Sequence, residues 1–114
     1  MVFDYKINEE NNIEILSLEG ELIDKNQSSL LIKQVDELLE NGRNRFVIDL
    51  SGLKYMNSSG LNVLIQLLTK TRNKGGESII CHVSKKVNEL LIITKLNTLF
   101  KVVETKEEAF KLLA

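Results

Sequence analysis

Two adjacent serines, Ser58 and Ser59, stand at the start of an apolar helical pattern, where a hydroxyl could support chemistry. A serine at this position can cap the helix by accepting a hydrogen bond from a backbone N–H group. It can also act as a nucleophile if a base lies within hydrogen-bond reach. His82 is the only histidine available as that base, and the chain has no Gly-x-Ser-x-Gly elbow and no phosphate-binding P-loop. These residues favour a structural or binding role over catalysis.

The counts of metal-binding residue types are low. Cys81 is the only cysteine and His82 the only histidine, so we expect no intrachain disulfide and neither a cysteine-based nor a His-rich metal site. Cys81 lies in a predicted strand and is interpreted as a small core residue. The sequence therefore predicts no metal and no cofactor.

The chain has 114 residues, 43% of them apolar, and a net charge of −1 from 15 basic and 16 acidic side chains. This length predicts a single domain over residues 1–114. The charges are well mixed, which argues against a nucleic-acid partner. The N-terminal residues lack the pattern of a signal peptide, and no apolar run reaches the ~18 residues of a membrane span. We therefore expect a cytoplasmic protein.

Strands and helices are predicted to alternate after an N-terminal pair of strands. The strands are expected at residues 2–8, 13–18, 45–50, 78–82 and 100–104. Helices are expected from residue 28 or 29 to 40, from 58 or 59 to 74, after Ser84, and after a capping box at residues 105–108. The order β-β-α-β-α-β-α-β-α predicts an α/β fold with a mixed, mostly parallel sheet and an N-terminal antiparallel hairpin. Loops at residues 20–25, 51–57 and 83–84 should meet at the carboxyl edge of the sheet.

One segment connects a strand, a loop and the start of a helix, and it carries the most specific pattern. Residues 49–65 read Asp-Leu-Ser-Gly-Leu-Lys-Tyr-Met-Asn-Ser-Ser-Gly-Leu-Asn-Val-Leu-Ile. This segment resembles the signature of the STAS domain family and, within it, of the bacterial anti-sigma factor antagonists. The elements Gly20-Glu21-Leu22, Gly75-Gly76 and Ser84 match as well, so the resemblance extends over essentially the whole chain.

The resemblance implies a phosphorylation switch and no enzymatic activity. An unphosphorylated antagonist binds an anti-sigma factor that is a serine kinase using ATP, and this releases the sigma factor. Phosphorylation of one serine, here Ser58, ends the interaction, and a serine phosphatase reverses the modification. The residues expected to bind the partner are Asp24, Met56, Asn57, Ser58, Ser59 and Gly60.

Two residues differ from the family pattern. Asn57 stands where the family usually has Asp, so a charge and a strong hydrogen-bond acceptor are missing beside the target serine. Ile23 follows Gly20-Glu21-Leu22 where Asp is usual, and Asp24 comes one residue later. The difference at Asn57 supports an alternative, in which the domain is a constitutive subunit of a transport or signalling complex and is not phosphorylated, whereas the shifted Asp24 bears on the partner contact.

Several residues have two interpretations from the sequence alone. Ser58 is a phosphorylation site or only a helix cap, with Ser59 as a second possible cap. Asp24 contacts a partner or caps the following helix, and Asp49 binds a ligand or hydrogen-bonds the neighbouring loop. Tyr55 and Met56 offer an apolar contact to a partner or fold back on the core.

Overall fold

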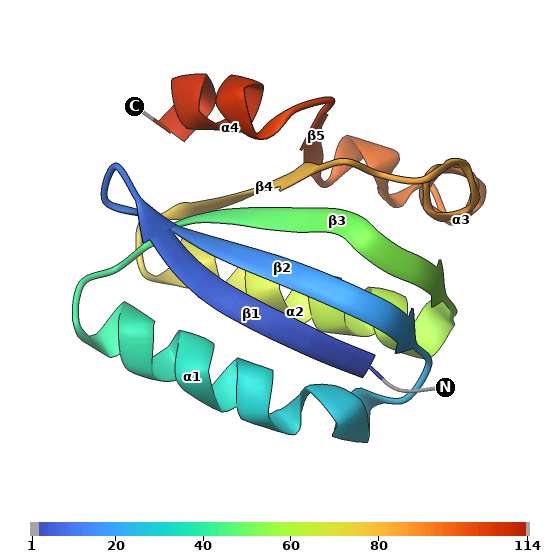
Figure 1. Ribbon diagram of the computed structural model, residues 1–114, viewed down its shortest axis with the longest axis horizontal. Helices are drawn as coiled ribbons and strands as arrows, with labels where there is room; N and C mark the ends of the chain where they lie inside the picture. Colours follow the sequence, from blue (N-terminus) through green and yellow to red (C-terminus); the bar gives the residue numbers. More distant parts are fainter. Residues whose placement is uncertain (1–2, 114) are drawn as a thin grey trace.

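The computed structural model describes residues 3–113, and it shows one five-stranded sheet with helices on both faces (Figure 1). The first two strands, β1 (Phe3–Glu10) and β2 (Ile13–Leu22), form an antiparallel hairpin. Asn11 and Asn12 connect them with φ values of 54° and 64°, which fits a tight turn whose twist matches the strands. The predicted hairpin is confirmed, although Val2, the expected first strand residue, lies outside the described residues.

The remaining strands, β3 (Arg45–Met56), β4 (Glu77–Cys81) and β5 (Lys101–Val103), are parallel, and the order in the sheet is β1-β2-β3-β4-β5. Four α-helices connect or follow these strands among the described residues: α1 (Ser29–Glu40), α2 (Ser58–Asn73), α3 (Lys85–Ile93) and α4 (Lys106–Leu113). Two 3₁₀ turns, η1 (Lys25–Ser28) and η2 (Leu96–Thr98), precede α1 and β5. The predicted fold class is confirmed.

The two faces of the sheet are covered unequally. Helices α1 and α2 lie on one side, and the short α4 lies on the other (Figure 1). The larger apolar cluster contains buried residues of α1, α2 and α3, whereas the smaller cluster joins Ala109 and Leu113 of α4 to residues of β2, β3 and β4. No helix within residues 3–113 has both the length and the apolar character needed to cross a membrane.

The segment between Ser51 and Asn57 differs from the prediction, which made it a loop. Strand β3 continues to Met56 and pairs with the end of β2, with Gly20 opposite Leu53 and Leu22 opposite Met56. Two register shifts, each with an extra residue in β3, accommodate the long pairing, and Gly20 adopts a φ of 85° opposite them. The segment is a strand because β2 offers a continuing hydrogen-bonding edge, while Leu53 and Met56 bury their side chains.

Candidate functional site

The start of α2 is held by Asn57. Its Oδ1 atom accepts a hydrogen bond from the Gly60 N–H at 3.0 Å, and its Nδ2 atom donates to the Ile23 carbonyl at 3.1 Å. Asn57 has extended backbone angles and is therefore the N-cap. The expectation that Ser58 or Ser59 caps the helix is wrong, because both serines already lie inside the first turn.

Gly60 allows the start of α2 to approach the end of β2. A Cβ atom at Gly60 would lie 2.1 Å from the Leu22 carbonyl oxygen and 2.8 Å from Cγ of Met56. The Leu22 carbonyl also accepts a hydrogen bond from the Asn57 N–H at 3.4 Å. Only glycine fits this close contact without displacement of the backbone. The position of the helix start is thus set by backbone packing and does not depend on the serine side chains.

The side chains of Ser58 and Ser59 are both exposed. Within residues 3–113, neither hydroxyl takes part in a hydrogen bond. The first N–H groups of a helix lack intrahelical acceptors. Among them, the Gly60 N–H donates its hydrogen bond to the Asn57 side chain. Ser58 therefore presents a free hydroxyl beside N–H groups at the positive end of the helix dipole.

A groove of about 490 Å³ begins at Ser58 and continues along α3. Tyr55 and Ile93 line it and are 46% and 77% exposed, while Lys86 and Glu89 place opposite charges beside it. Met56 also lines the groove but is only 5% exposed and belongs to the large core cluster. Of the two alternatives for Met56, the structure shows packing on the core, so its side chain offers little area to a partner.

Asp24 caps the short turn η1. Its Oδ1 atom accepts a hydrogen bond from the Asn26 N–H at 2.9 Å, while Oε1 of Gln27 accepts from the Asp24 N–H at 2.9 Å. Asp24 therefore caps this 3₁₀ turn and not α1, whose N-cap is Ser28. Asp24 is exposed, and Asn57 contacts the preceding residue, Ile23. Its carboxylate thus remains accessible near the start of α2, and its contact with a partner stays a prediction.

A second group of polar residues lies where β3 and β4 pair. Asp49, Cys81 and His82 each place one potential metal-binding atom within 4.8 Å of the others. Oδ1 of Asp49 accepts a hydrogen bond from the Ser51 N–H at 2.9 Å, which confirms its predicted structural role. Counting cysteines and histidines missed this mixed group; the pairing of the two strands was the signal that could have revealed it.

Cys81 is a core residue, as predicted, with no exposed area. Burial, and secondarily the charge of Asp49, raises the pKa of its thiol to about 12. Such a thiol is a poor nucleophile near neutral pH. His82 and Ser58 line different concavities, and no interaction within the described part of the chain joins them.

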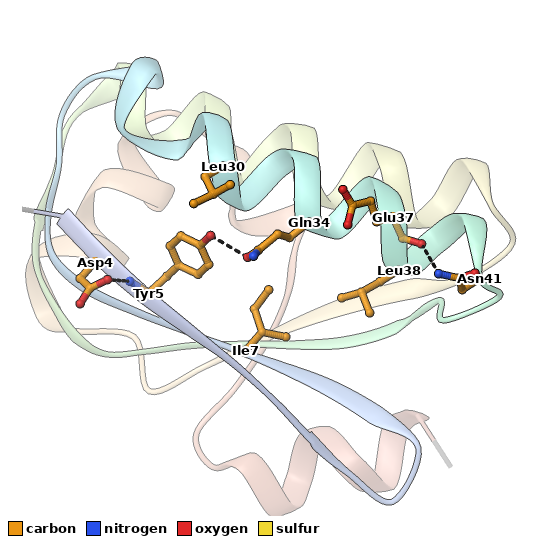
Figure 2. Close-up of a pocket in the computed structure, with 8 residues that line it drawn as sticks. All are labelled: Asp4, Tyr5, Ile7, Leu30, Gln34, Glu37, Leu38 and Asn41. Carbon is orange, nitrogen blue, oxygen red and sulfur yellow. Dashed lines mark hydrogen bonds between the residues drawn. The ribbon is translucent and has the colours of Figure 1, made fainter.

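A further concavity of about 640 Å³ lies between the edge strand β1 and α1 (Figure 2). The Tyr5 hydroxyl donates a hydrogen bond to Oε1 of Gln34 at 2.6 Å across it. Burial, with the negative charge of Asp4, raises the pKa of Tyr5. Leu30, Ile7 and Leu38 supply the apolar part of the lining. This concavity shares no residue with the Ser58 groove.

Known proteins of one family resemble this chain in both sequence and fold. The STAS domain family matches residues 4–109. An anti-sigma F factor antagonist of Paenibacillus polymyxa is 35% identical over 89 residues, which cover 77% of this chain and 73% of that protein. A crystal structure of a Thermotoga maritima protein assigned to the anti-sigma factor antagonists has a TM-score of 0.83 and 30% identity, covering 97% of this chain and 93% of that one.

The fold is also shared with the phosphorylated form of SpoIIAA, a cell fate determinant of Bacillus. That structure has a TM-score of 0.74 and 16% identity, covering 97% of this chain and 100% of that one. At this identity the likeness concerns the fold alone. Together, the family match and the curated relatives place the chain in the STAS domain family, among the anti-sigma factor antagonists.

Proposed function

We propose that this protein acts in the cytoplasm as a phosphorylation-switched anti-sigma factor antagonist. Its unphosphorylated form binds an anti-sigma factor that is a serine kinase, and phosphorylation of Ser58 ends the binding. The observation that carries the proposal is the exposed, unbonded Ser58 hydroxyl at the start of a helix whose backbone is fixed independently by Asn57 and Gly60.

The surface around Ser58 supports a docked partner. Exposed apolar area on Tyr55 and Ile93 borders the groove, and burial of such area drives association. Asp24, Asn57 and Ser59 provide polar atoms near the same helix start. The buried Met56 and Gly60 would act indirectly, by setting the shape of this surface. A partner seated here would cover the Ser58 hydroxyl.

Phosphorylation changes this surface without a need to refold the domain. Transfer from ATP forms a bond between Ser58 Oγ and phosphorus, releases ADP and a proton, and leaves a charge of about −1.5 to −2. The helix start can accept that charge, with a stabilisation of about 0.3–1 kcal/mol at an exposed site. A partner packed over the same position would have to desolvate the phosphate, so binding fails while the fold persists.

The partner set of the proposal includes a serine phosphatase that restores the hydroxyl. The protein itself is proposed to be a binding module and not an enzyme. The arrangement of Asp49, Cys81 and His82 away from the Ser58 groove supports that view, because the nucleophile and the only imidazole line different concavities.

The proposal can be tested with the cognate anti-sigma factor kinase and ATP. We expect wild type and Ser59→Ala to gain one phosphate each by mass spectrometry, and Ser58→Ala to gain none while still binding the kinase. Ser58→Asp should remain folded by circular dichroism but bind at least about tenfold more weakly. Tight binding by Ser58→Asp would show that the interface lies elsewhere.

The second function, a constitutive subunit of a transport or signalling complex, is favoured by one observation. The neutral Asn57 uses both ends of its amide in structural hydrogen bonds, so a capped helix start does not require a charged residue or a switch. An active kinase that leaves wild-type Ser58 unmodified, and modifies Asn57→Asp no better, would support this function over the first.

A further inference from the structure

We propose that Asp49, Cys81 and His82 form a binding site for Zn²⁺ or a chemically similar divalent transition metal. The site is independent of the proposed switch at Ser58, because it uses other residues and a different concavity. The three potential ligands are a carboxylate oxygen, a sulfur and an imidazole nitrogen, which lie within 4.8 Å of one another.

Two features of the backbone bring these side chains together. In the parallel pairing of β3 with β4, Asp49 lies opposite Cys81. Consecutive strand residues normally point to opposite faces of a sheet, which would separate Cys81 from His82. His82, however, has a φ of 57° and lies just beyond β4. This left-handed conformation ends the alternation and allows both side chains to reach the same place.

The ligand types suit zinc. Zn²⁺ is bound by thiolate, imidazole and carboxylate groups, and three protein ligands with a water molecule form a common tetrahedral arrangement. Bond lengths of about 2.0–2.3 Å place neighbouring ligand atoms roughly 3.3–3.8 Å apart. Closing the site from 4.8 Å requires a shift of about 1 Å or slightly more, which the exposed His82 and the partly exposed Asp49 can provide. Cys81 would lose its proton to solvent on binding.

The surroundings provide support and access. The Ser51 N–H holds one carboxylate oxygen of Asp49, which orients the group while the second oxygen remains available. His82 also lines an open concavity of about 950 Å³ together with Glu104 and Glu108. A metal ion could enter from this side, and a water molecule could complete its coordination there.

Nearby positive charges oppose a cation, and one of them, Lys85, lines the same concavity as His82. The positive charge of Lys106, in α4, lowers the pKa of Cys81, whereas the negative charges of Asp49 and Glu107 raise it. The Lys106 ammonium pairs with Glu10 at 3.1 Å, and this pairing reduces its repulsion. We therefore expect Lys106→Met to tighten metal binding several-fold, whereas Lys111→Met, on the exposed part of the same helix, should change it little.

Co²⁺ added to the purified, reduced protein tests the site by spectroscopy. Because Cys81 is the only cysteine and His82 the only histidine, a thiolate-to-cobalt absorption band must come from Cys81, and a displaced imidazole NMR signal from His82. We expect both signals to appear together at one equivalent and to disappear when Zn²⁺ displaces Co²⁺.

Two conservative variants make the test specific. Asp49→Asn keeps an oxygen for the Ser51 N–H, and His82→Asn places a residue that tolerates the left-handed backbone. Each should weaken Co²⁺ binding at least about tenfold, while Glu89→Gln in the Ser58 groove should have no effect. Absence of the thiolate band at saturating Co²⁺, or an unchanged affinity in either site variant, would overturn the proposal.

Discussion

Ser58 and Cys81 both lie near ends of parallel strands, yet their environments differ. At Ser58 the side chain is exposed and unbonded, while Asn57 and Gly60 fix the backbone beneath it. At Cys81 the side chain itself is buried, and its exposed neighbour His82 has the unusual backbone conformation. Modification of the Ser58 side chain is therefore compatible with the fold, whereas modification of Cys81 would disturb the packing of the core.

The largest expected effect concerns the reactivity of Cys81. Burial and the charge of Asp49 raise the pKa of its thiol from 9.0 to about 12, so at pH 8 the folded protein should contain about a thousandfold less thiolate than the unfolded chain. Alkylation by iodoacetamide, measured in EDTA with and without denaturant, should show at least that difference in rate. Between pH 8 and pH 11 the alkylation rate of the folded protein should rise about tenfold per pH unit, whereas the rate of the unfolded chain should level off above pH 9. Equal rates would contradict the buried position.

Gly60→Ala should have the largest effect on stability. The added Cβ atom would meet the Leu22 carbonyl at 2.1 Å, so the start of α2 must move away from β2. We expect the free energy of unfolding to fall by about 3 kcal/mol or more, as measured by urea denaturation. Ser59→Ala, one residue earlier, is the matched control and should stay within about 0.5 kcal/mol of wild type.

Asn57→Ala should have an intermediate effect. It removes the acceptor of the Gly60 N–H and the donor to the Ile23 carbonyl, and loss of an N-cap typically costs about 1 kcal/mol. Asn57→Asp keeps the acceptor and should recover most of the loss in the same denaturation experiment. If Asn57→Ala were as stable as wild type, another residue would cap α2.

Ser58→Asp should have the smallest effect on stability. The exposed side chain places a negative charge at the positive end of α2, so the free energy of unfolding should rise by about 0.3–1 kcal/mol or stay unchanged. Thermal unfolding at low and high salt would measure this difference, since salt screens the gain. A large destabilisation would mean that the Ser58 site is packed like Cys81, and the contrast between the two sites would disappear.

Much of the fold follows from local patterns in the sequence. Alternation and short polar links predict the hairpin of β1 and β2, and apolar periodicity predicts α1 and α2. Ser84 was predicted to cap α3, and its hydroxyl accepts a hydrogen bond from the Val87 N–H at 3.2 Å. The position of Ser58 at a helix start and the family signature of residues 49–65 were likewise readable in the sequence.

Other features depend on contacts between distant residues. Asn57, Ser58 and Ser59 all have side chains that can cap a helix, and only the packing of Gly60 on Leu22 and the bond from Asn57 to Ile23 select Asn57. Residues 51–56 form a strand because β2 continues beside them.

The group of Asp49, Cys81 and His82 shows the same division. The sequence determined which ligand types the chain contains, because residue identity needs no folding. Only the tertiary structure decided that they meet, because the register of β3 against β4 and the left-handed turn at His82 set their separation. The register joins Asp49 to Cys81, more than thirty residues later in the chain, and no local pattern records such a pairing.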